Sequence, residues 1–250
     1  MNGHLTGMIY SFLLAVVPTV IAITLHEAAH GYAAWALGDD TAKRMGRLSL
    51  NPLAHVDRMG TIILPGFLLI SQLLTVGRVV FMFGWAKPVP VNAMRFADPR
   101  RGMMLVAAAG PAMNFVLAWL GALALWLIPQ LASSPAMMGR ALSFVLYFML
   151  ANIVLGTFNL LPIPPLDGGR IVVGLLPLPM ARAWARLERA GLLVVLLAVF
   201  LLPSALREFG IHFDPVRALL GWVGEPILRA VLWLAGDPQA GAILLGDDDF

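Results

Sequence analysis

The sequence predicts an all-α polytopic membrane protein, with about five to six transmembrane helices and a re-entrant or extended (short β) element between the first and second core helices. Hydrophobic residues make up 60% of the 250 residues, and charged residues only 12%. Soluble domains contain about 25% charged residues, and several apolar runs here approach the roughly 20 residues that span a bilayer. An unusually apolar soluble protein is therefore disfavoured.

The first predicted element is a long helix over residues 8–37, because this stretch is apolar and no basic start or cleavage site marks a signal peptide before it. Residues 61–83 are also apolar but are interrupted by Pro65, Gly66 and Gly77. We expect a re-entrant or hairpin-like element there, broken near Pro65 and Gly66 or near Gly77. The Pro-rich stretch 84–101 follows, and its VPVN core indicates extended backbone.

Two further helices are predicted over residues 103–128 and 140–161, because the first carries no charge and the second is apolar after Arg140. An arginine-rich stretch then leads into an apolar helix that ends near Leu202. The last apolar run, 216–235, contains Glu225, Pro226 and Arg229, so it indicates a span only weakly. We divide the chain into a catalytic transmembrane core, residues 1–170 with a re-entrant region 61–101, and C-terminal helices of the same membrane domain, residues 171–250.

Chemistry is concentrated in the stretch LHEAAHGYAAWALGD, which places His26, Glu27 and His30 near the end of the first helix. Residues four apart lie on one helix face, so the two imidazoles can hold one metal ion while Glu27 reaches a water beside it. The alternative is that the three side chains only pack against polar partners. Ionisable groups at membrane depth are costly and are functional by default, which favours a metal site.

A tetrahedral catalytic zinc needs a third protein ligand and one open position. The chain has no cysteine, so only histidines and acids remain as candidates. Asp167 follows an apolar helix in NLLPIPPLDGGR, where three prolines prevent regular helix. Broken backbone at membrane depth is tolerated where it is buried in protein or lines a wet cavity. The alternatives stay open at this point: Asp167 as a helix N-cap, or a ligand from among His4, His55, His212, Asp214 and Glu225.

HEAAH, GPAMN at Gly110–Asn114 and NLLPIPPLDGGR at Asn159–Arg170 together resemble the site-2 protease family of intramembrane zinc metalloproteases. NPLAHVD and GWAKPVPVN are also similar to segments of its small bacterial members. The resemblance implies one Zn²⁺ per chain held by His26, His30 and Asp167, with Glu27 as the catalytic base. It further implies that Asn159 helps to hold the substrate or oxyanion, and that Asn114 has a role in packing or substrate contact.

The resemblance implies cleavage of transmembrane substrate proteins in regulated intramembrane proteolysis. A PDZ-like insertion and a C-terminal nucleotide-binding module are not visible, so the manner of substrate selection is open. A membrane metal-binding or transport protein without protease activity is the alternative, although transporters tend to show repeated halves that are not visible here. The oligomeric state is not decided by the sequence.

The charge pattern predicts topology. The net charge of +3 comes from basic residues clustered between apolar runs, which is typical of a membrane protein that binds no nucleic acid. If Asp167 and the histidines share one zinc, their two helices must run in the same direction, and residues 61–83 must make no net crossing. The basic loops 43–58, 87–101 and 170–189 then face the cytoplasm. We expect a bacterial inner-membrane protein whose site lies nearer that face of the lipid bilayer.

Overall fold

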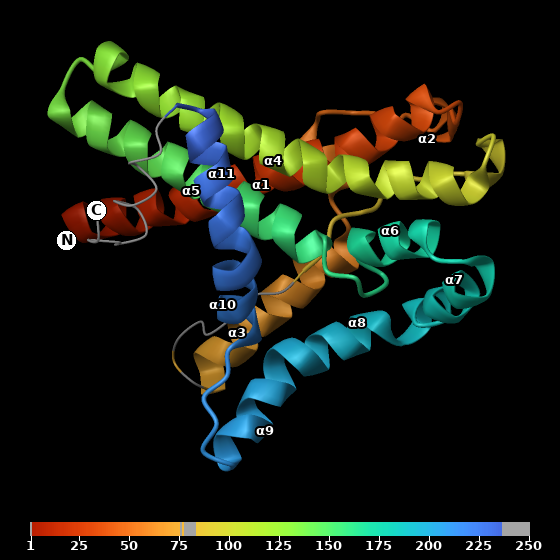
Figure 1. The fold of residues 1–250 in the computed structure, drawn as a ribbon. Coiled ribbons are helices and arrows are strands. Elements are labelled where there is room, and N and C mark those ends of the chain that lie inside the picture. Colours follow the sequence, from red (N-terminus) through yellow and green to blue (C-terminus); the bar gives the residue numbers. More distant parts are fainter. Residues whose placement is uncertain (1, 76, 78–83, 237–250) are drawn as a thin grey trace.

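The structure is a computed structural model that describes residues 2–75, 77 and 84–236 (Figure 1). It is helical throughout, and no strand occurs in the described ranges. The expectation of an all-helical membrane protein is confirmed. The short β element stays a prediction, because the extended segment 84–92 forms no ladder within the part of the chain that the structure describes.

Three long helices form the centre of the molecule: α1 (Asn2–Ala36), α4 (Pro99–Leu131) and α5 (Pro135–Asn159). They pack against one another in all three pairs. Figure 1 shows that α4 runs opposite to α1 and α5, so α1 and α5 run in the same direction, as the sequence predicts. Close packing is possible because small residues face neighbours; a Cβ on Gly121 would lie 2.6 Å from Met149 Cγ.

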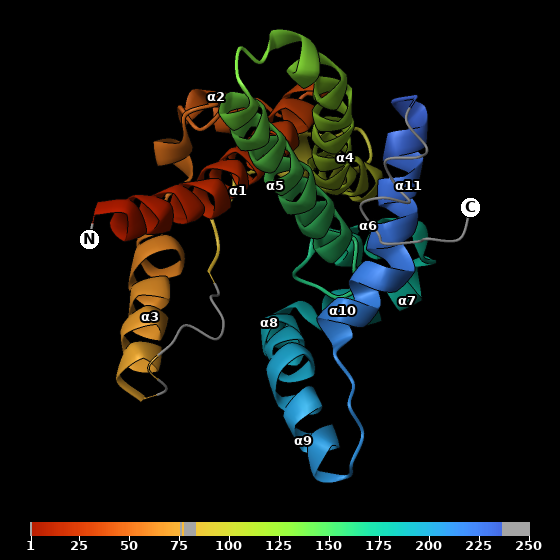
Figure 2. The same cartoon turned by 90° about the vertical axis from the view of Figure 1, so that its left-hand side faces the viewer.

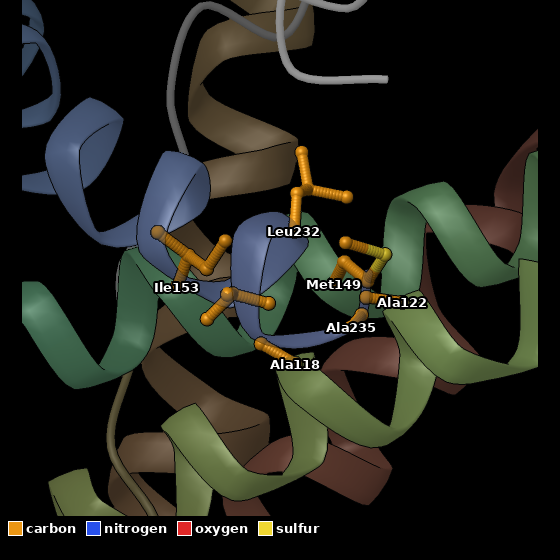
Figure 3. Packing of buried hydrophobic residues seen from close by; sticks show 7 residues of the cluster. Ala118, Ala122, Met149, Ile153, Leu232 and Ala235 are labelled. Atoms are coloured by element: carbon orange, nitrogen blue, oxygen red, sulfur yellow. The ribbon is translucent and has the colours of Figure 1, made fainter. Parts of the chain in front are cut away.

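The C-terminal part contains α6 (Asp167–Leu175), α7 (Leu178–Ala185), α8 (Glu188–Leu196), α9 (Leu202–Glu208), α10 (Pro215–Leu219) and α11 (Glu225–Leu234). A buried cluster joins α11 to α4 and α5 (Figure 3) and includes Ala118, Met149 and Leu232. The C-terminal helix therefore shares a hydrophobic core with the central helices.

Among the described residues, four helices are long and apolar enough to cross a membrane: Ile9–Ala36, Arg58–Thr75, Pro99–Leu131 and Pro135–Asn159. Two further helices are continuous across π turns, from Glu188 to Glu208 and from Pro215 to Leu234. The number of five to six crossings stays a prediction, since helix length alone does not decide which of these segments span.

Of the two predicted positions for a break, the one near Pro65 and Gly66 is wrong, because one helix continues through both residues. A π turn over Arg58–Ile63 leads directly into α3 (Leu64–Thr75), and Leu64 N–H donates to Met59 O, five residues back. A proline ring clashes with the carbonyl four residues earlier in a regular helix, and the wider π turn relieves this clash. The same arrangement precedes Pro203 and Pro226.

The segment nevertheless returns to its starting point. Trp85 N–H donates to Gly60 O at 3.2 Å, and Thr61 Oγ1 donates to Trp85 O at 2.9 Å. The two ends of residues 60–85 therefore lie together, while Figure 2 shows α3 extending away from the core. Gly77, two residues beyond the end of α3, has a positive φ of 73°, consistent with the predicted break at that residue. The rest of the predicted element, at 76 and 78–83, lies outside the described residues. Ends that lie together favour a segment without a net crossing, and that reading stays a prediction.

This geometry predicts that residues 45 and 94 lie on one side of the membrane and residue 133 on the other. The chain has no native cysteine, so Met45→Cys, Met94→Cys and Ser133→Cys can each be labelled alone. An impermeant maleimide applied to right-side-out and inverted vesicles should label the first two from the same side. Labelling of Met45→Cys and Met94→Cys from opposite sides would show that residues 60–85 cross the membrane.

The loop after α1, which contains α2 (Thr41–Arg44) and the short turn Pro52–His55, holds the extended segment 84–92 in place. Lys87 N–H donates to His55 O at 2.8 Å, and Asn92 N–H donates to the buried Asp39 at 2.6 Å. Burial would raise the pKa of Asp39, but hydrogen bonds from Thr41 and Asn92 lower it below its ordinary value. Asp39 therefore remains an ionised acceptor that ties segment 84–92 to the end of α1.

Candidate metal centre

The two histidines of α1 point toward α4 and are held by acceptor groups at their Nδ1 atoms. His26 Nδ1 lies 2.6 Å from Asn114 Oδ1, and His30 Nδ1 lies 2.7 Å from Val106 O. Because both partners only accept, each histidine donates from Nδ1 and keeps a lone pair on Nε2. The two Nε2 atoms are 3.1 Å apart. Two metal-binding lone pairs therefore converge between α1 and α4.

Asp167, the first residue of α6, completes this group. Its Oδ2 lies 3.2 Å from His26 Nε2 and 3.3 Å from His30 Nε2. The same oxygen is buried and has no hydrogen-bond partner. Leu166, not Asp167, occupies the N-cap position of α6, so the alternative that Asp167 is an N-cap is not supported.

The three atoms are spaced as ligands of one small cation. Their mutual distances of 3.1, 3.2 and 3.3 Å form a nearly equilateral triangle. Ligands at about 2.0–2.1 Å from a tetrahedral zinc are roughly 3.3 Å apart. In the described part of the chain this is the one group of three or more histidine or acidic residues with such convergent atoms. The donor set therefore fits a tetrahedral metal with a free fourth position.

Two glycines after Asp167 allow the chain to fold tightly around this position. A Cβ on Gly168 would lie 2.2 Å from Leu160 O, and one on Gly169 would lie 2.3 Å from Pro164 N. Both contacts are with backbone atoms, which cannot move aside as a flexible side chain can. The DGG sequence is therefore required for the loop that brings Asp167 to α1.

Glu27 lies beside the triangle and faces a cavity of about 400 Å³. The walls of this cavity come from α1, residues 84–86, α5, the loop before Asp167 and α8. Glu27 is half-buried, and its Oε2 accepts a hydrogen bond from Val89 N–H at 3.2 Å. Segment 84–92 thus holds the carboxylate at a cavity that His26 also lines.

Comparisons with known proteins agree with this arrangement. Residues 127–202 match Peptidase family M50. A Bacillus subtilis (strain 168) protein named "Putative zinc metalloprotease YwhC" is 39% identical over 193 residues, which cover 75% of this chain and 80% of that protein. The chain belongs to peptidase family M50, the site-2 protease family.

More distant M50 relatives are similar over the same extent. The protein named "Putative zinc metalloprotease Rip2" of Mycolicibacterium smegmatis is 30% identical over 200 residues, covering 79% of this chain and 70% of that protein. The protein of the same name from Mycobacterium tuberculosis (strain H37Rv) is 30% identical over 196 residues, which cover 77% of this chain and 68% of that protein. No solved structure matches the chain. The family resemblance seen in the sequence is confirmed, and this M50 chain is an integral membrane protein.

The two asparagines singled out in the sequence occupy different positions. Asn159 lines the cavity beside Glu27, and its Nδ2 donates to Leu155 O at 3.0 Å. Asn114 is fully buried against His26. This position favours packing over substrate contact for Asn114, because a wholly buried side chain offers no surface to a substrate.

Asn152 is a residue that sequence analysis missed. Its Oδ1 accepts from Asn114 Nδ2 at 2.9 Å, and its own Nδ2 donates to Phe148 O at 2.8 Å. These bonds orient the Asn114 amide so that its oxygen faces His26 Nδ1. The available signal was an asparagine inside an apolar helix, where an unsatisfied amide is costly.

The other acids and histidines considered as ligands lie elsewhere. His55 is buried in the loop after α1, where its Nε2 lies 2.9 Å from Ser49 O. Asp214 caps α10, Glu225 pairs with Arg229 at 2.9 Å, and His212 is exposed. For His4 the structure describes the backbone alone.

Gly110 allows α4 to contact both imidazoles. A Cβ at this position would lie 2.5 Å from His30 Nε2 and 2.6 Å from His26 Cε1. We predict that Gly110→Ala weakens zinc affinity, because both imidazole rings must shift. Loss of a group that only hydrogen-bonds a metal ligand weakens metal affinity about 10–100-fold, and we expect an effect at least as large here. Isothermal titration with zinc measures this effect.

Gly139→Ala is the matched control, since nothing lies within 4 Å of that Cβ. The control should bind zinc as the native chain does. Equal zinc affinity in both variants would show that the contact between Gly110 and the imidazoles does not set the metal centre.

Proposed function

We propose that this chain is an intramembrane zinc metalloprotease that holds one zinc ion with His26, His30 and Asp167 and hydrolyses peptide bonds of transmembrane proteins. The observation that carries the proposal is the triangle of three convergent ligand atoms, together with the Glu27 carboxylate that lines the same cavity as His26. Imidazole and carboxylate ligands with a free fourth position are typical of catalytic zinc. A zinc ion there supplies Lewis acidity, which polarises a peptide carbonyl and lowers the pKa of water to about 7.

Glu27 supplies the proton transfer. Its carboxylate takes a proton from water as the water attacks the peptide carbonyl, and returns that proton to the departing amine nitrogen. Val89 N–H fixes one carboxylate oxygen at 3.2 Å, so the other oxygen is available for the proton. We assign to Asn159, which lines the cavity, a hydrogen bond to the substrate carbonyl oxygen from the Nδ2 hydrogen that Leu155 O does not accept.

A membrane-spanning substrate helix buries its peptide bonds in its own hydrogen bonds and must unwind before attack. We propose that segment 84–92 receives the unwound strand by backbone pairing. Ala86 of this segment lines the cavity, and bonds from the loop after α1 hold its other positions, including Lys87 and Asn92. A rigid extended edge beside Glu27 is the element that this step requires.

The position of the site within the membrane follows from the charge pattern. The described loops on the side where α1 and α5 end carry most of the basic residues. By the positive-inside rule this side faces the cytoplasm. We therefore propose an inner-membrane enzyme of a bacterium whose site lies nearer the cytoplasmic face.

Substrate trapping tests the function. Membranes from cells that produce the native chain, Glu27→Gln or the control Glu208→Gln are compared by quantitative proteomics. Glu208 is exposed at the end of α9, away from the site. Glu208→Gln therefore makes the same chemical change as Glu27→Gln at a position outside the site. We expect a membrane protein to copurify with Glu27→Gln and its fragments to accumulate with the native chain and with Glu208→Gln. A zinc-loaded native chain that cleaves no membrane protein, and instead carries zinc across vesicles, would establish the transporter alternative.

A further inference from the structure

A second cavity, which proteolysis does not use, lies behind the loop that carries Asp167. Its volume is about 370 Å³, and it is enclosed by the start of α4, by α6 and by the start of α8. An open cavity of about 750 Å³ adjoins it, because the two share Ala185 and Glu188. We call the two together the arginine cavity.

Positive charge dominates the arginine cavity. It is lined by four arginines and one acid: Arg100, Arg170, Arg182, Arg186 and Glu188. Arg170 lies 3.5 Å from Glu188, and both side chains are about half exposed. Arg182 and Arg186 are exposed one helical turn apart, and no carboxylate of the described residues lies within 4 Å of either. Four positive charges against one negative leave an excess of three, which favours an anion.

The smaller cavity also has apolar walls beside its charged residues. Met103 of α4 and Val173 of α6 form its walls with Pro164. The neighbouring helix α7 exposes Leu178 and Met180, which are 51% and 57% accessible. A short helix that exposes both apolar and basic side chains is suited to the boundary between headgroups and acyl chains. The cavity therefore combines guanidinium groups at its mouth with an apolar interior at the level where α4 begins.

We propose that the arginine cavity binds an anionic phospholipid, with the phosphate between Arg182 and Arg186 and the upper acyl chain against Met103 and Val173. Guanidinium groups form paired hydrogen bonds to phosphate oxygens, and basic pockets between membrane helices recognise anionic headgroups. A soluble phosphate would use the arginines but not the apolar interior, so the combination favours a lipid. The bound lipid would contact Gly169 and Arg170, directly after Asp167.

Lipid binding to the purified full-length chain tests this proposal. Native mass spectrometry in detergent measures the affinity for phosphatidylglycerol and for phosphatidylcholine of the same chain length. We expect a clear preference for phosphatidylglycerol. The double variant Arg182→Gln, Arg186→Gln should bind it about 25-fold more weakly, since each arginine near an anionic lipid contributes about fivefold.

Two further variants separate a built site from general surface charge. The control Arg44→Gln, Arg101→Gln removes two exposed arginines that pair with Asp40 and Asp98 outside the cavity, and it should bind as the native chain does. Met103→Trp keeps every charge but fills the apolar interior, and it should also lose binding. Thermal unfolding of each variant shows whether it is folded, and Met103→Trp tests the site even if the double arginine variant is not.

Three outcomes would overturn the proposal. Equal loss in the control and in the cavity double variant would indicate attraction by surface charge alone. Native affinity in a folded Met103→Trp would exclude the acyl chain from the cavity. Full displacement of phosphatidylglycerol by inorganic phosphate, with phosphate bound at equal strength, would identify a free phosphate site. Neither the variants nor the readout depends on proteolysis, so the result is independent of the proposed enzymatic function.

Discussion

Glu27→Gln is expected to abolish proteolysis while zinc stays bound. A positioned general base contributes about 10²–10⁴-fold to rate, and a carboxamide cannot accept the proton of water. The three convergent ligand atoms belong to other residues, so the metal centre is untouched. The glutamine oxygen can still accept from Val89 N–H, which keeps segment 84–92 in place. Cleavage rates and zinc content, measured on the same purified sample, give the result.

The control for this prediction is Glu208→Gln, which makes the same chemical change at the exposed end of α9. It should retain native rates and native zinc content. If Glu27→Gln cleaved at close to the native rate with full zinc, another group would have to be the base. If Glu27→Gln lost zinc as well, Glu27 would be needed for zinc binding, and the loss of activity would not identify it as the base.

The parts of the site that lie within one helix turn could be predicted from the sequence. His26, Glu27 and His30 are fixed relative to one another by helix geometry alone. The same local reasoning predicted the apolar helices, which the structure places at Asn2–Ala36, Pro99–Leu131 and Pro135–Asn159. Periodicity and composition act within a segment, so they predict segments well.

The remaining parts depend on which segments meet, and the sequence pattern records this only indirectly. Helix spacing left the third ligand open. The proline-interrupted stretch NLLPIPPLDGGR made Asp167 one candidate among several, and the family resemblance implied it as the ligand. Asn114 was a candidate for packing or for substrate contact until the fold placed it 2.6 Å from a histidine 88 residues earlier. The hydrogen bond between Asn114 and Asn152 likewise joins two helices, so the sequence around either residue alone does not predict it.

The contact between the two ends of residues 60–85 agrees with a re-entrant segment, while the absence of a net crossing stays a prediction. Counting crossings predicted that this segment makes no net crossing, since the ligands must share one depth. The location of the break at Pro65 was wrong, because the π turn before it accommodates the proline. Proline marks a lost hydrogen bond, but whether the helix breaks or widens there depends on the turn that precedes it.

Asp167→Ala is expected to remove zinc and activity together. The mutation deletes the oxygen that lies 3.2 and 3.3 Å from the two imidazole nitrogens, and two ligands remain. Loss of an outer-shell partner alone weakens metal affinity about 10–100-fold, so loss of a ligand should exceed this range. Zinc stoichiometry after dialysis and affinity by competition with a chelator measure the change.

The structural alternative for Asp167 is stabilisation of the α6 N-terminus, and the chain contains a matched control for it. Asp214 caps α10, accepting from Val216 N–H and Arg217 N–H at 3.0 Å each. Asp214→Ala should lower the free energy of unfolding by about 1 kcal/mol and leave zinc binding unchanged. If Asp167→Ala behaved in the same way, with native zinc affinity and a modest loss of stability, Asp167 would be a helix-terminal residue and the zinc would need another third ligand. Because Asp167 Oδ2 is buried without a hydrogen-bond partner, we expect the two variants to differ.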